Sequence, residues 1–195
     1  MSRLMRTSTV MKRPVVTMAG EDVAQVKDIV YGAGGGAVSG FTLAGRGLFA
    51  GPLKRALPWS SVVALGPDAV MIRDEDVLES LAELLDSSDD TGSRGDVLGA
   101  QVLTDTGTDL GTVVDVILEV TGAGGDQCDV VGYEVEASEA LGTEGARVFV
   151  PLPDTLSASG SHLMVPASAR DFVAHDLAGF GAAVLAFRQQ LGGQH

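Results

Sequence analysis

Two stretches of sequence decide the fold: VTMAGEDVAQVKDIV at residues 16–30 and LTDTGTDLGTVVDVI at residues 103–117. They lie 87 residues apart and share identical residues at five positions, Thr17/Thr104, Gly20/Gly107, Asp22/Asp109, Val26/Val113 and Asp28/Asp115. A second pair of blocks, PWSSVVALGPDAVMI at 58–72 and PLPDTLSASGSHLMV at 151–165, aligns at an offset of 93 residues. Repetition over such a length predicts two copies of one domain.

Glycine-rich turns separate short apolar alternations in both copies, a pattern typical of small antiparallel sheets. One of these turns, GAGGGA at residues 32–37, also fits the G-x-G-x-x-A form of a dinucleotide-binding turn. That turn must open a helix and be followed, about 20 residues later, by an acidic residue that binds the ribose. Here more glycines and β-type residues follow, and residues 29–67 contain no Asp or Glu. We therefore interpret the run as a hairpin turn.

The segments PVVTMAGEDVAQVKDIVYGAGGGAVSGFTLAG at 14–45 and LPWSSVVALGPDAVMI at 57–72 resemble the PRC-barrel domain family. The resemblance covers residues 12–73 well and residues 97–166 more loosely, because Leu152 stands where the first copy has Trp59. It implies a small, strongly bent antiparallel β-barrel without catalytic activity. Such barrels occur in the photosynthetic reaction-centre H subunit and in the ribosome-maturation factor RimM, where they dock onto other macromolecules.

The expected architecture is mainly β, with two small antiparallel β-barrels in tandem, a short helix after the first and an amphipathic helix at the C-terminus. The segment RDEDVLESLAELLD at 73–86 has the apolar face of a helix, and DSSDDTGSRGD at 86–96 has the composition of a linker. The expected divisions are a flexible basic N-terminus (1–11), a first barrel (12–73), a helix and acidic linker (74–96), a second barrel (97–166) and a helical extension (167–195).

Charge is distributed unevenly along the 195 residues. Residues 1–67 hold eight Lys/Arg and three Asp/Glu, whereas residues 68–195 hold five and twenty-three, which gives the chain its net charge of −13. The asymmetry indicates either an anion-binding first half or two halves that attract each other, and the net charge argues against nucleic-acid binding. The basic start has no apolar core of a secretory signal, and Cys128 has no second cysteine to pair with, so we expect a cytoplasmic protein.

The sequence offers few groups for catalysis. The three histidines, His162, His175 and His195, lack the spacing of a metal site, and no G-x-S-x-G elbow is present. We predict no catalytic residue, no cofactor and no metal, and hence no enzyme. Asp28 and Asp115 recur among apolar neighbours, and we interpret them as structural carboxylates that accept backbone N–H groups in both copies.

A C-terminal stripe provides the strongest candidate for partner binding. Its residues are spaced four and three apart along one helical face: Val173, Leu177, Phe180, Val184, Phe187 and Leu191. The stripe either packs on the protein's own barrels or binds a partner, including a second copy of the chain. Trp59 has the same two interpretations, core residue or interaction anchor.

These observations favour a non-enzymatic protein-binding adaptor or scaffold. Two alternatives stay open: a ribosome-maturation or RNA-processing accessory similar to RimM, and a small-molecule-binding protein or enzyme with a pocket between the barrels. A peripheral membrane contact through the basic residues Arg3, Arg6, Lys12 and Arg13 is a further hypothesis.

Overall fold

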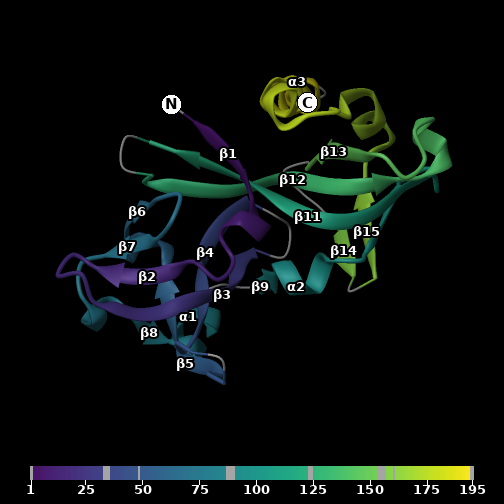
Figure 1. Cartoon of the computed structure of the whole chain (residues 1–195). Coiled ribbons are helices and arrows are strands. Elements are labelled where there is room, and N and C mark those ends of the chain that lie inside the picture. The colour runs from purple at the N-terminus through teal and green to yellow at the C-terminus, as the bar shows by residue number, and fades with distance from the viewer. Residues whose placement is uncertain are drawn as a thin grey trace.

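Residues 2–32, 36–47, 49–86, 91–122, 125–152, 157–159 and 161–193 are described by a computed structural model of the chain (Figure 1). Fifteen strands of the described residues belong to one curled sheet, and helices are few and short apart from the last one. The mainly β class and the C-terminal helix expected from the sequence are confirmed.

The first half of the chain is a curled meander of strands. Neighbouring strands from β2 to β5 pair antiparallel, β6 pairs antiparallel with β7, and β7 returns to lie parallel to β2. The strands are β2 (Pro14–Thr17), β3 (Asp22–Gly32), β4 (Gly36–Ala44), β5 (Pro52–Pro58), β6 (Val62–Leu65) and β7 (Val70–Ile72).

The second half repeats this pairing strand by strand. Neighbours from β10 to β13 pair antiparallel, β14 pairs antiparallel with β15, and β15 lies parallel to β10. The strands are β10 (Gln101–Thr104), β11 (Asp109–Thr121), β12 (Gln127–Ala137), β13 (Arg147–Pro151), β14 (Ser157–Ser159) and β15 (His162–Val165). Even the bulges coincide, because the ladder shifts between Val26 and Asp28 and again between Val113 and Asp115. Each long strand therefore bends at the same place.

The two halves exchange their first strands. Strand β1 (Arg3–Arg6) precedes the first half in sequence but pairs antiparallel with β11 of the second, with Arg6 opposite Ile117. Strand β9 (Thr91–Ser93) precedes the second half but pairs antiparallel with β3 of the first, with Ser93 opposite Val30. Arg6 and Ser93 lie 87 residues apart, as do Val30 and Ile117, so the exchange is reciprocal.

This exchange corrects two expectations. The N-terminal segment, expected to be a flexible basic arm, contains β1 and the 3₁₀-helix η1 (Thr7–Thr9). The end of the expected acidic linker contains β9 and the short helix α2 (Arg94–Val97). Both strands are short, and each has its pairing partner in the other half, so the local pattern alone carries no strand signal. Residues 87–90 of that linker lie outside the described residues.

The halves also share a seam and a core. Strand β12 pairs antiparallel with β4, with Asp129 opposite Ala37, which joins the two meanders edge to edge. One apolar cluster then runs through both, from Val26 and Phe41 in the first half to Val113 and Tyr133 in the second. The halves are therefore parts of one folded body, and their interior is filled by side chains.

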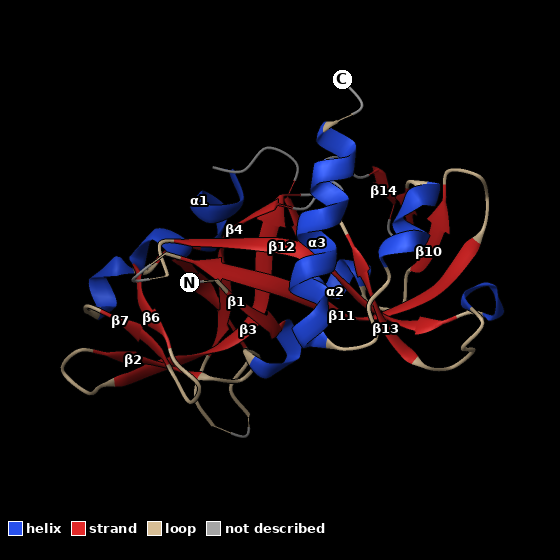
Figure 2. Ribbon diagram, turned by 90° about the horizontal axis from the view of Figure 1, so that it is seen from above, coloured by secondary structure: helices blue, strands red, loops and turns tan. Residues whose placement is uncertain are grey.

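Helical segments cover the outer faces of the meanders (Figure 2). Leu84 of α1 (Leu81–Asp86) packs on Val30 and Ala56, and α3 (Leu177–Gly192) packs on the corresponding face of the second half. The helix expected at 73–86 is shorter than predicted, because η3 (Glu75–Val77) and β8 (Glu79–Ser80), which pairs with β5, precede it. The remaining 3₁₀-helices are η2 (Trp59–Ser61), η4 (Glu139–Leu141) and η5 (Ala167–Phe172).

Candidate interaction surfaces

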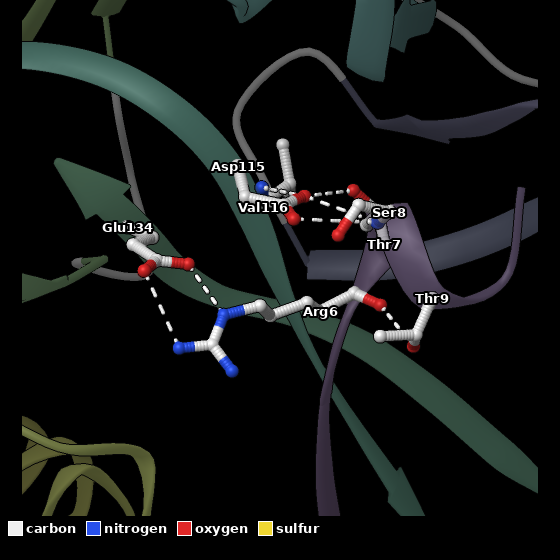
Figure 3. Close-up of polar contacts among 7 residues, drawn as sticks. All are labelled: Arg6, Thr7, Ser8, Thr9, Asp115, Val116 and Glu134. Atoms are coloured by element: carbon white, nitrogen blue, oxygen red, sulfur yellow. Dashed lines mark hydrogen bonds and ion pairs between the residues drawn. The ribbon is translucent and has the colours of Figure 1, made fainter. Parts of the chain in front are cut away.

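An ion pair fixes the exchanged strand β1 on the second half (Figure 3). The Arg6 guanidinium contacts the Glu134 carboxylate through two nitrogens, with Nε at 2.5 Å from Oε2, and lies 5.3 Å from the centre of the Phe149 ring. The hydrogen bond to Glu134 raises the pKa of Arg6 above its ordinary value. Glu134 is only 8% exposed, and Arg6 compensates for the water that its carboxylate loses on burial.

A second carboxylate holds the turn that follows β1. Asp115 accepts hydrogen bonds from the Thr7 hydroxyl at 2.5 Å, from the Ser8 N–H at 3.2 Å and from its neighbour Val116 N–H at 2.8 Å (Figure 3). Its counterpart Asp28 accepts the N–H of Ile29 at 2.8 Å, so the structural interpretation of both aspartates is confirmed. Asp115 is 4% exposed and surrounded by donors. Such a carboxylate fixes the backbone rather than transferring protons.

The basic residues near the N-terminus are largely engaged within the protein. Arg3 donates to the Leu65 carbonyl at 2.7 Å, and Arg13 donates to the adjacent Gly66 carbonyl. Burial and the nearby Arg3 charge lower the pKa of Arg13. Of the four residues in the expected membrane contact, Arg3 and Lys12 are exposed, whereas Arg13 and Arg6, which pairs with Glu134, are half-buried. The membrane contact stays a prediction.

The predicted partner-binding residues lie in the core or pack against it. Trp59 is buried and meets Phe41 edge to face, with 5.9 Å between ring centres. Phe180, Val184 and Phe187 of the C-terminal stripe are also buried, and Phe180 packs on Phe149. The other members of the stripe pack against the same apolar clusters: Val173, Leu177 and Leu191. Of the two interpretations of the stripe, the structure favours packing on the protein's own sheet.

Two further polar features of the described residues are a hollow lined by acidic side chains and the cysteine Cys128. An open hollow of about 550 Å³ is lined by Asp109, Glu136, Glu139 and Glu144, and no His, Cys, Asp or Glu group in the described ranges gathers as a metal site. Cys128 is buried at the seam, and burial raises the pKa of its thiol to about 12. A thiol with that pKa is a poor nucleophile near neutral pH.

Phe49 differs from the other aromatic residues in its exposure to solvent. Phe49, in the connection between β4 and β5, is 100% exposed, whereas the other eight aromatic side chains are buried or half-buried. In this connection the Gly45 N–H donates to Gly51 O at 3.1 Å, and the Ala50 N–H donates to Gly47 O at 3.2 Å. Sequence reasoning missed Phe49, although an aromatic residue between glycines was a usable signal.

A comparison with protein families finds one match along the first half. Residues 3–78 match the model of the PRC-barrel domain. The matched segment begins with β1, so by sequence β1 belongs to the half from which it has been exchanged. No curated protein matches the chain. No helix of the described residues is long and apolar enough to cross a bilayer.

Proposed function

Because residues 3–78 are a PRC-barrel domain, we propose that the protein is a non-enzymatic adaptor that binds another protein. We further propose that residues 101–165 form a second domain of the same type, which the repeated strand pairing and bulges support. The buried charged groups also fit this role, since Arg6, Glu134 and Asp115 hold the two halves together.

The exposed Phe49 carries the proposal. A phenylalanine in water gains about 2–3 kcal/mol when a partner buries it, and aromatic side chains are enriched at the centres of protein interfaces. Phe49 lies in a turn with backbone hydrogen bonds from Gly45 N–H to Gly51 O and from Ala50 N–H to Gly47 O, which limit the backbone freedom lost on docking. We therefore assign the β4–β5 connection as the docking tip.

The charges beside Phe49 define the partner. Arg46 and Lys54 flank it in sequence; the Arg46 side chain is half exposed beside Asp22, and Lys54 is exposed. The tip also belongs to the half of the chain in which basic residues exceed acidic ones. The proposed partner surface has an apolar pocket surrounded by carboxylates.

Photocrosslinking at position 49 tests the proposal. A photoreactive phenylalanine replaces Phe49 in the cells that produce the protein, and the same group replaces Met18, another exposed apolar loop residue, as the matched control. We expect one protein to crosslink from position 49 alone. That protein is then purified, and its affinity is measured for wild type, Phe49→Ser and Met18→Ser.

The expected loss of affinity is roughly tenfold or more for Phe49→Ser, and Met18→Ser should bind like wild type. Equal crosslinking from both positions, or unchanged binding of Phe49→Ser, would overturn the proposal. Crosslinking to a ribosomal protein that survives nuclease treatment would support the ribosome-maturation alternative instead. Crosslinking to RNA alone would exclude a protein-binding tip.

A further inference from the structure

Helix α3 is apolar on both faces. Its inner face packs on the second half, yet its outer face also lacks charge, because residues 177–187 contain no Asp, Glu, Lys or Arg. Leu185 is 60% exposed on that outer face, beside the exposed Ala178 and Ala182. The helix lies on the outside of the molecule in both overall views (Figures 1 and 2). A helix that is apolar all round is normally covered on all sides.

A groove adjoins the N-terminal part of this face. It has a volume of about 460 Å³ and is lined by Ser2, Arg3 and Leu4 at β1 and by Leu177, Ala178 and Gly181 of α3. Leu185 and Ala178 therefore lie on the same stripe of α3. Leu185 protrudes from this stripe, and Ala178 borders the groove. The two features lie seven residues apart, or about 10 Å along the helix axis.

We propose that a second copy of the chain covers this surface, with the two α3 helices antiparallel across a two-fold axis between Gly181 and Ala182. This pairing places Leu185 of each copy in the groove beside Ala178 of the other copy. Because of the two-fold symmetry, the contact forms twice. The small residues on the axis allow the helices to approach closely. The contact is independent of the Phe49 tip.

Charge supports a second copy as the occupant. In a chain of net charge −13, an uncharged helix face is where two copies repel each other least. Since α3 is only about 24 Å long, the contact is smaller than a standard interface, and a weak, micromolar dimer is expected.

Sedimentation velocity over roughly a hundredfold range of concentration measures the association. We expect wild type to shift from monomer to dimer and Leu185→Glu to stay monomeric. Val63→Glu, at an exposed apolar position on β6, is the control and should dimerise like wild type. Circular dichroism establishes that each variant is folded.

Disulfide trapping tests the axis directly. Ala182→Cys should oxidise to a covalent dimer, whereas Gln190→Cys, exposed on another side of the helix, should not. Monomeric wild type at all concentrations, dimerisation of Leu185→Glu, or equal trapping of both cysteines would overturn the proposal. Co-sedimentation of monomeric wild type with lipid vesicles would show that a membrane covers the face instead.

Discussion

At the scale of single residues, two carboxylates on neighbouring strands of the second half differ in their surroundings. Asp115 is satisfied by a hydroxyl and backbone N–H groups, whereas Asp129 lies at the seam opposite Ala37 and accepts one bond from the exposed Gln127 side chain at 2.8 Å. Desolvation by burial raises the pKa of Asp129, opposed in part by Gln127 and Arg188. The ionised form of Asp129 is therefore less favourable in the folded chain than in the unfolded chain.

This difference predicts a pH-dependent effect of Asp129→Asn. A carboxyl group with a higher pKa in the folded chain binds its proton more tightly there, so its contribution to the free energy of unfolding falls as the pH rises through that range. We expect Asp129→Asn to be more stable than wild type at neutral pH and to lose this advantage at mildly acidic pH. Urea denaturation at both pH values measures it. A variant less stable than wild type at neutral pH would contradict the argument.

At the scale of elements, the local hairpins were predictable and the exchanged strands were not. Glycine turns and apolar alternation identified strands such as β3 and β11, and the four-and-three spacing identified α3. Strands β1 and β9 are short, and the residues they pair with lie in the other half. The apolar stripe on α3 was predicted from the sequence, but the surface that it packs against was not, because helical periodicity identifies an apolar face and not the residues that contact it.

Removal of β1 tests the exchange. Deleting residues 2–6 removes the strand that pairs with β11 and leaves Glu134 without Arg6. We expect amide hydrogen exchange to accelerate first in β11, around Ile117–Val120, rather than in β3, although β1 is closer to β3 in sequence. A synthetic peptide of residues 1–13 should restore protection. Accelerated exchange confined to β3 would contradict the assignment.

At the scale of the whole molecule, residues 1–67 and 68–195 carry opposite net charge, but the two halves are joined by more than electrostatic attraction. Two exchanged strands, one edge pairing and a shared apolar cluster connect them. Separate barrels on a linker, as the sequence led us to expect, would be able to unfold independently. The observed arrangement predicts one cooperative transition.

Two probes test this cooperativity. Fluorescence of Trp59, the only tryptophan, reports on the first half, and hydrogen exchange of the β11–β12 ladder reports on the second. We expect both to change at the same urea concentration. Two separate midpoints would show that the strands couple the halves only weakly. Arg6→Met should lower both midpoints together, because it leaves Glu134 buried and unpaired.

The exchange of strands also sets an order of events during synthesis. Arg3 pairs with Val120, so β1 leaves the ribosome 117 residues before its partner. At about 5–20 residues per second, β1 waits roughly 6–23 seconds for that partner. The first half waits as well, since β3 is completed only when β9 has been made. A nascent chain that is stalled before residue 91 thus carries an open edge on β3, and there a chaperone would find its binding site.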